Sequence, residues 1–235
     1  MVATSNIKKV IFKIAHYCFP QLLYRKISYS QDGEDMMLQT YYETKKHYKG
    51  FYVDVGAHHP YRFSNTAYFY KKGWRGINIE PTPTLFRAFQ RHRKRDINLN
   101  VGISASNTTM PFYVFNDQAL NTFDEQLAQE RHHARDRYEI ISKMDVQTSS
   151  LKDILEKYLP INQSIDFLTV DVEGLDLEVL ASNDWAKFCP KFILVECETD
   201  VVNQSSINTF LQHNGYILVG RTKRTSLFKH QNAEL

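Results

Sequence analysis

The chain has 235 residues, 43% of them apolar, and a formal net charge of +3. That length and composition suit one globular α/β domain with a large core, and no run approaches the roughly 18 apolar residues of a membrane-spanning helix. Three cysteines without a C-x-x-C pair argue against a disulfide framework or a zinc cluster, so we expect a reducing, cytoplasmic compartment.

The positive charge is concentrated at the N-terminus. Residues 1–31 contain five Lys or Arg and no Asp or Glu, whereas the rest of the chain is near neutral. Apolar side chains recur there at helical spacing, at Ile7, Val10, Ile11, Ile14 and Cys18. Residues 1–27 therefore form a basic amphipathic arm, either at an anionic membrane surface on the cytoplasmic side or docked on its own domain.

The next segment, Ser30-Gln-Asp-Gly-Glu-Asp35, precedes a predicted helix. Ser30 or Asp32 is the expected N-cap, and Glu34 and Asp35 suit the positive end of the helix dipole. This explains the acidic residues without a functional role.

The segment Phe51-Tyr-Val-Asp-Val-Gly-Ala-His-His-Pro60 reads as a buried strand followed by a glycine turn. Open α/β sheets bind nucleotide-like ligands where such a strand ends. The later glycines of G-x-G-x-x-G are missing, which disfavours a pyrophosphate cradle. An adenosine-bearing ligand without phosphates, such as S-adenosylmethionine, fits better; the alternative is a core strand with a tight turn.

A second strand, 76–79, ends at Glu80, whose carboxylate suits the hydroxyls of a ribose. A helix over 82–91 and a third strand over 97–101 follow, and 110–115 is the candidate fourth strand. The basic run 91–95 reads as a solvated helix end, because positive charge is favourable there. With a near-neutral body, it does not indicate a nucleic-acid surface.

Residues 116–148 do not fit the alternation of strands and helices. Their polar stretch 126–138 reads as an exposed helix within a long insertion. Long connections in compact domains often act as lids over a site and are otherwise mobile, so we expect residues 116–148 to be either a lid or a mobile insertion.

The strand 165–170 enters Asp171-Val-Glu-Gly174, which brings two acids to the same edge of the sheet as Asp54. They are candidates to orient an acceptor hydroxyl, accept its proton or hold a metal; the alternative is capping of the following helix. His58 and His59 are further candidates because histidine titrates near neutral pH. Glu196 and Glu198 add acids after a strand at 192–195.

The C-terminal part completes the pattern. Helices are predicted over 151–158, 177–181 and 207–213, and the strands 216–219 and 225–228 form an antiparallel pair. The alternation predicts a doubly wound, mostly parallel sheet with helices on both faces.

Several motifs together resemble the FkbM family of S-adenosylmethionine-dependent methyltransferases. They occur in family order over roughly residues 28–200. The matching segments are 30–35, 51–57, Ser64-Asn-Thr66, Gly76-Ile-Asn-Ile-Glu-Pro81, Asn100-Val-Gly-Ile-Ser104 and 165–174. The resemblance implies a class I methyltransferase (Rossmann-like) fold with a seven-stranded sheet, an antiparallel last strand and a single domain over 28–235.

The resemblance also implies roles for individual residues. The implied cofactor-binding residues are Gln31, Asp54, Gly56, Ala57, His58, Asn65, Glu80, Asn100, Val101 and Gly102. Within this set, Glu80 would bind the ribose and Asn100–Gly102 would lie near the adenine. Asp171 and Glu173 would face the methyl group or the acceptor. The resemblance does not assign the catalytic base; by their chemistry the candidates are Asp171, then Glu173, then one of the two histidines, His59 or His58. The metal requirement stays open.

The expected activity is transfer of a methyl group from S-adenosylmethionine to a hydroxyl of a sugar, glycan or related natural product. Two alternatives stay open: N-methylation of an amino sugar, and a non-catalytic methyltransferase-like binding domain. Nucleic acid is not an expected acceptor, because the body is near neutral and no Asn-Pro-Pro-Tyr type motif is present.

Overall fold

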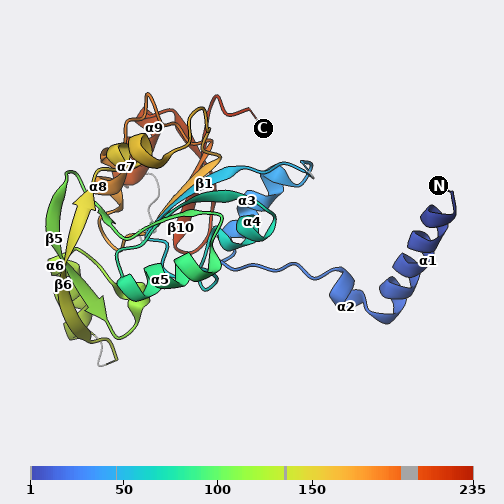
Figure 1. Cartoon of the computed structure of the whole chain (residues 1–235), viewed down its shortest axis with the longest axis horizontal. Helices are drawn as coiled ribbons and strands as arrows, with labels where there is room; N and C mark the ends of the chain where they lie inside the picture. The colour runs from blue at the N-terminus through green and yellow to red at the C-terminus, as the bar shows by residue number, and fades with distance from the viewer. Residues whose placement is uncertain (1, 46, 135–136, 197–205, 235) are drawn as a thin grey trace.

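The computed structural model describes residues 2–45, 47–134, 137–196 and 206–234 (Figure 1). A seven-stranded sheet has the order β3-β2-β1-β7-β8-β10-β9. Its strands are β1 (Phe51–Val55), β2 (Arg75–Ile79), β3 (Ile97–Leu99), β7 (Phe167–Val170), β8 (Phe192–Glu196), β9 (Tyr216–Arg221) and β10 (Thr225–His230). The first five are parallel, and β10 runs antiparallel to both β8 and β9. The predicted fold with its antiparallel last strand is confirmed.

Helices cover both faces of the sheet because both faces of its central strands are apolar. Along β1, Val53 and Val55 pack in one core cluster and Tyr52 in another. The first cluster includes side chains of α7 (Leu151–Tyr158), α8 (Asp176–Ala181) and α9 (Ser206–His213). The second includes side chains of α3 (Glu34–Tyr42) and α4 (Ala67–Lys71). The remaining helix of the sheet region, α5 (Pro83–His92), follows β2.

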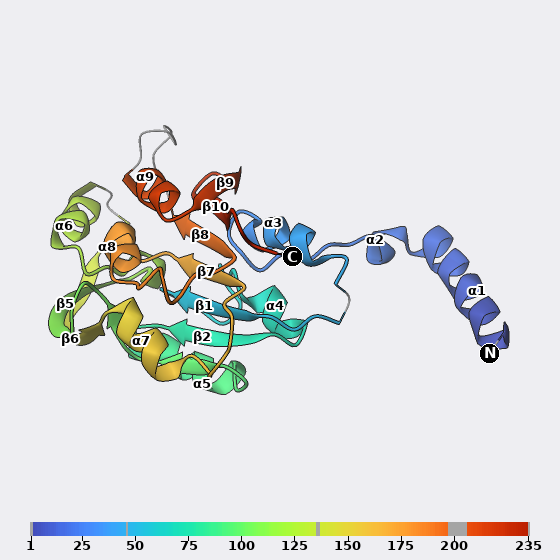
Figure 2. The same ribbon diagram turned by 90° about the horizontal axis from the view of Figure 1, so that it is seen from above.

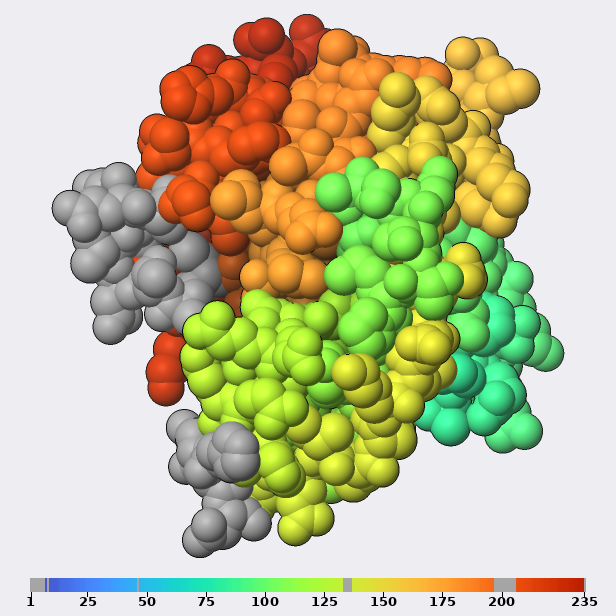
Figure 3. Space-filling view, turned by 90° about the vertical axis from the view of Figure 1, so that its left-hand side faces the viewer, coloured from blue at the N-terminus to red at the C-terminus, as the bar shows by residue number. Residues whose placement is uncertain are grey.

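A second, three-stranded sheet lies beside the main one. It has the order β4-β6-β5, formed by β4 (Gly102–Ile103), β5 (Thr108–Phe115) and β6 (Ile140–Ser149). Between β5 and β6 lie the short 3-10 helix η1 (Gln118–Leu120) and α6 (Glu125–Ala134). The candidate fourth strand at 110–115 thus exists, but it pairs antiparallel with β6 outside the main sheet. Figure 3 shows this green-to-yellow unit beside the orange segment that contains α8.

The start of α3 differs from the sequence-based prediction. Its N-cap is Gly33, in the left-handed conformation, rather than Ser30 or Asp32. Ser30 Oγ nevertheless accepts the main-chain N–H of Asp35 in the first turn at 3.3 Å. Asp35 is fully buried and accepts hydrogen bonds from the hydroxyls of Ser28 and Ser30 and from the Tyr29 N–H. The acid therefore holds the preceding chain segment in place.

Arg93 is also placed differently from the prediction. The sequence predicts a solvated basic helix end over residues 91–95, but Arg93 is 0% exposed. Its guanidinium donates to the carbonyl of Pro60, to Ser64 Oγ and to Tyr52 Oη, and pairs with Asp96 at 3.7 Å. A buried cation is retained only when charges and acceptors surround it. Here the loop after β1, the strand β1 itself and the segment before β3 supply them.

The N-terminal arm stands apart from the body (Figures 1 and 2). It consists of α1 (Val2–Cys18), α2 (Pro20–Leu23) and an extended stretch that leads to α3. Among the described residues, none of the helices is long and apolar enough to cross a membrane.

Candidate active site

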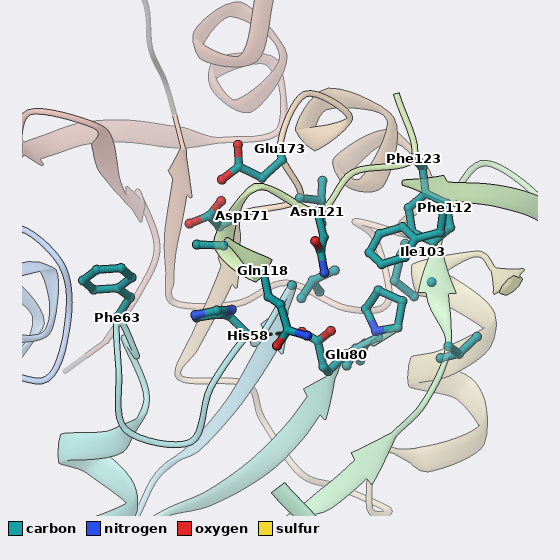
Figure 4. A pocket seen from close by; sticks show the side chains of 18 of the residues that line it. His58, Phe63, Glu80, Ile103, Phe112, Gln118, Asn121, Phe123, Asp171 and Glu173 are labelled. Atoms are coloured by element: carbon teal, nitrogen blue, oxygen red, sulfur yellow. Dashed lines mark hydrogen bonds between the residues drawn. The ribbon is translucent and has the colours of Figure 1, made fainter. Parts of the chain in front are cut away.

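A cavity lies where β1, β2 and β7 end (Figure 4). Its wall contains Gly56, His58, Glu80, Asp171 and Glu173 from the main sheet. The second sheet and its connection add a largely different set of side chains: Ile103, Phe112, Gln118, Ala119, Asn121 and Phe123. The cavity is therefore a joint product of both sheets.

Glu80 is the fixed polar group on the floor of this cavity. Its carboxylate accepts the main-chain N–H of His58 at 2.8 Å and that of Thr82 at 2.7 Å. Burial raises the pKa of Glu80 to about 7, although these hydrogen bonds oppose the shift. A carboxylate offers about four lone-pair sites, so two donors leave capacity for a ligand's hydroxyl groups.

Asn100 supports Glu80 from outside the cavity. Its side-chain amide donates to the carbonyl oxygens of Glu80 and Pro81, both at 2.8 Å. Asn100 does not line the cavity, whereas Val101 and Gly102, which follow it, do. A Cβ on Gly102 would lie 2.4 Å from the Phe123 ring, so the glycine makes room for that ring.

Gly56 shapes the turn after β1. Its φ is +78°, and a Cβ there would lie 1.8 Å from the carbonyl oxygen of Asp171. The N–H groups of Gly56 and Ala57 both donate to the Ile79 carbonyl at 3.1 Å. The glycine thus lets β1 and the segment after β7 approach each other closely, and Ala57 is buried behind the cavity wall.

Asp54 lies beneath the turn and does not line the cavity. Its carboxylate accepts the Thr66 hydroxyl at 2.8 Å, and burial raises its pKa to about 6. Asn65, also outside the wall, donates to Thr169 Oγ1 at 3.0 Å. Both residues fix the loop 57–66 against the sheet.

The two adjacent histidines have different environments. His58 lines the cavity with φ +52°, and both of its ring nitrogens are buried without a hydrogen-bond partner. Burial, and then the charge of Arg62, lowers the pKa of His58 to about 4, so its ring is neutral at pH 7. His59 lies outside the wall, and its Nδ1 accepts the N–H groups of Tyr61 and Arg62.

Two carboxylates, Asp171 and Glu173, lie in the wall of the cavity, and Glu196 lies beside them. Oxygens of these three side chains lie within 4.8 Å of one another, close enough to bind one divalent cation. Burial, then the charges of Glu196 and Glu173, raise the pKa of Asp171 well above its usual value. Capping does not explain Asp171, because α8 begins only at Asp176. Glu198 lies outside the described residues.

A larger cavity of about 660 Å³ adjoins this site and shares four wall residues with it, Gln31, Phe63, Ala119 and Glu173. Its wall carries both signs of charge. Arg131 of α6 pairs with Glu173, Arg62 pairs with Asp117 at 3.8 Å, and Arg224 pairs with Asp32 at 2.9 Å. Phe63, Leu120, Leu127 and Tyr138 add apolar and aromatic surface.

The inner cavity alone is small, about 80 Å³, below the roughly 300–1,000 Å³ of typical ligand pockets. In Figure 4 the Gln118 side chain projects across the cavity in front of Glu80. Its amide donates only a long hydrogen bond, 3.4 Å, to Thr84.

Sequence reasoning missed most wall residues from the second sheet. Phe112 and Phe123 stack with ring centroids 4.5 Å apart, and Asn121 donates to Thr82 Oγ1 beside Glu80. The missed strand β6 had a signal, because Met144, Val146 and Thr148 alternate with polar residues. With this strand recognised, the end of the insertion would have been predicted to pair with β5.

Comparisons with known proteins identify a family for this chain. A family model described as the methyltransferase FkbM domain matches residues 54–218. The chain is also similar to a solved structure, methyltransferase FkbM from Methylobacillus flagellatus KT, with 15% identity and a TM-score of 0.45. That alignment covers 77% of this chain and 43% of the other, so the chain spans less than half of that protein. A search of curated proteins finds no match.

Proposed function

Because the chain belongs to the FkbM methyltransferase family, we propose that it transfers a methyl group from S-adenosylmethionine to a hydroxyl of a sugar, glycan or related natural product. The observation that carries the proposal is the pairing of two features in one cavity. A fixed acid, Glu80, suits a ribose, and a basic carboxylate, Asp171, lies across the cavity from it.

The wall offers a separate surface to each part of the cofactor. The apolar side chains of Val101, Ile103, Phe112 and Phe123 suit an adenine ring. Glu80 would accept hydrogen bonds from the ribose hydroxyls, and the buried, unpartnered ring of His58 offers one polar contact more. The methionine end would then lie near Gly56, once Gln118 moves aside.

The cofactor supplies an electrophilic methyl group on a sulfonium, so the protein's tasks are alignment and proton removal. The walls of the larger cavity would hold the acceptor with its oxygen facing the cofactor, which lowers the entropic barrier. Asp171 would accept the hydroxyl proton, because a carboxylate with a raised pKa is a stronger base. Glu173, already paired with Arg131, is the second candidate base.

The larger cavity suits a polyhydroxylated acceptor. Paired arginines and carboxylates present donors and acceptors without a large excess of one charge. Phe63 and Tyr138 add aromatic surface for the C–H groups of a sugar ring, with Arg62 stacked over Phe63 and Arg137 over Tyr138. His59 has no part in this proposal, because its Nδ1 is occupied by two backbone N–H groups.

We place the activity in the cytoplasm, since Cys18 and Cys189 are free and exposed, which suits a reducing compartment.

Calorimetric titration with S-adenosylmethionine tests the cofactor assignment, and saturable binding to wild-type protein is expected. Absence of binding by folded protein would refute it. Mass spectrometry of candidate sugars and glycans then tests catalysis, with one added methyl on oxygen expected. Methylation of an amino sugar on nitrogen would favour the N-methyltransferase alternative, and binding without product would favour a non-catalytic domain.

A further inference from the structure

The N-terminal helix α1 exposes a row of large apolar side chains. Ile7, Val10, Ile11, Phe12, Ile14 and Tyr17 are between 53% and 82% exposed, although such residues are usually buried. Phe19, Leu22 and Tyr24 continue this surface through α2, at 58%, 68% and 60% exposed. The described body of the protein therefore does not cover the arm, and docking of the helix on its own domain is not what the structure shows.

The exposed side chains are ordered around the helix axis. At 100° per residue, Ile7, Ile11 and Ile14 fall within one narrow sector, with Val10 beside them. Lys9 and Lys13 fall on the opposite side. The isoleucine side of the helix is thus apolar, whereas the other side carries the lysines together with Phe12. Helices that lie in the plane of a membrane interface divide apolar and basic side chains in this way.

The charge of the arm selects the kind of surface. Residues 1–31 contain Lys and Arg but no Asp or Glu. An anionic lipid surface attracts each nearby basic side chain, while the apolar face enters the acyl boundary. A second copy of the same arm would instead bring like charges together, which opposes self-association.

We propose that residues 2–27 bind the surface of an anionic phospholipid membrane, with α1 lying in the interface plane and its isoleucines inserted. This binding goes beyond methyl transfer and does not depend on it. Gln31 of the site follows Ile27 by four residues, a reach of at most about 14 Å. The bound arm therefore keeps the larger cavity close to the lipid surface.

Sedimentation of the full chain with vesicles tests the proposal. Binding is expected to phosphatidylcholine vesicles that contain phosphatidylglycerol, to weaken at high salt, and to be much weaker with phosphatidylcholine alone. Equal binding to both kinds of vesicle, or to neither, would overturn it. Binding of S-adenosylmethionine, measured separately, would be the same for wild type and arm variants, so failure of one proposal is distinguishable from failure of the other.

Two pairs of variants localise the contact. Lys9→Ser with Lys13→Ser should weaken binding about 30-fold, at roughly 1 kcal/mol per basic side chain. The matched control, Lys152→Ser with Lys157→Ser, removes the same charge from the exposed surface of α7 and should leave binding unchanged.

Ile11→Ser with Ile14→Ser should weaken binding roughly 10- to 100-fold, because two partly exposed side chains would no longer enter the membrane. Ile141→Ser with Ile161→Ser alters isoleucines on the body that are 59% and 93% exposed, and should have no effect. Equal losses in arm and body variants would place the contact elsewhere. Self-association through the arm, seen by light scattering in the absence of lipid binding, would identify a second copy as the partner instead.

Discussion

The main-chain N–H of His58 donates a hydrogen bond to Oε2 of Glu80 at 2.8 Å. This contact joins the turn after β1 to the acid after β2, two features that are 22 residues apart in the sequence. Thr82 holds the other carboxylate oxygen, so the orientation of Glu80 is fixed before any ligand binds. A preorganised acceptor of this kind lowers the entropic cost of binding a nucleoside.

Glu80→Gln should weaken S-adenosylmethionine binding roughly 5- to 100-fold. Glutamine removes the negative charge and replaces one acceptor oxygen with an NH₂ donor, so the ribose loses a charge-assisted hydrogen bond worth about 1–3 kcal/mol. Calorimetric titration measures the change. Glu156→Gln, on the surface of α7, is the control and should bind as wild type does. Equal affinities for Glu80→Gln and wild type would remove Glu80 from the ribose site.

The affinity for the cofactor should depend on pH through Glu80. The pKa of this acid is raised to about 7, and ribose hydroxyls donate to its ionised form. Affinity should therefore rise about 10-fold between pH 6 and pH 8 as the carboxylate ionises, and Glu80→Gln should lose this rise. S-Adenosylhomocysteine is a suitable stable probe, and a flat profile for wild type would contradict the assignment.

The stability of the ligand-free protein should fall as pH rises, whereas the affinity for the cofactor rises. Since the pKa of Glu80 is raised on folding, its contribution to stability is present below pH 4.5 and is lost as pH rises through about 7. Asp54, with a pKa raised to about 6, acts in the same direction. Thermal unfolding from pH 5 to pH 8 measures this, and Glu80→Gln should reduce the slope.

The sequence allowed prediction of the main sheet because buried strands, glycine turns and terminal acids carry local signals. Glu80 and Asp171 could be assigned to one edge for that reason, since parallel strands end together. Arg93 could not be placed, because a cation is buried only when distant residues such as Pro60 and Tyr52 supply acceptors. The positions of His58 in the cavity wall and of His59 outside it likewise depend on the conformation of the loop after β1, which the order of residues in the sequence does not reveal.

Gly56→Ala should destabilise the fold by several kcal/mol, and Gly33→Ala should cost about 1–2 kcal/mol. Both glycines have positive φ, +78° and +91°, so both substitutions bear the left-handed strain. Only at Gly56 would the new Cβ also collide with a backbone atom, the Asp171 carbonyl oxygen. Urea unfolding measures the free energy of unfolding of both variants. The loss in Gly33→Ala reports the backbone strain alone, and the additional loss in Gly56→Ala reports the collision. Equal losses in the two variants would show that the structure relieves the collision without cost.

Arg93→Met should lower the free energy of unfolding by about 3–5 kcal/mol, because it leaves the buried Asp96 without its cation. Arg91→Met, at an exposed position two residues earlier, should change it by less than about 0.5 kcal/mol. Chemical denaturation measures both variants. A loss of similar size in the two would mean that helix α5, rather than the buried network, is responsible.

Asp171→Asn should lower the rate of methyl transfer about 10²- to 10⁴-fold, the usual contribution of a general base. The substitution keeps the size of the side chain and removes its proton affinity. Affinity for S-adenosylmethionine should change little, because Glu80 and the apolar wall are intact. Rates are followed by mass spectrometry of the methylated acceptor, once an acceptor is identified.

The pH profile distinguishes a base from a positioning group. Because the pKa of Asp171 is raised by burial and by Glu196 and Glu173, the wild-type rate should climb with pH well above the range of an ordinary carboxylate. Asp171→Asn should lose that rising limb, whereas Glu173→Gln should shift it to lower pH by removing a neighbouring negative charge. If Glu173→Gln abolishes the limb and Asp171→Asn retains it, then Glu173 accepts the proton.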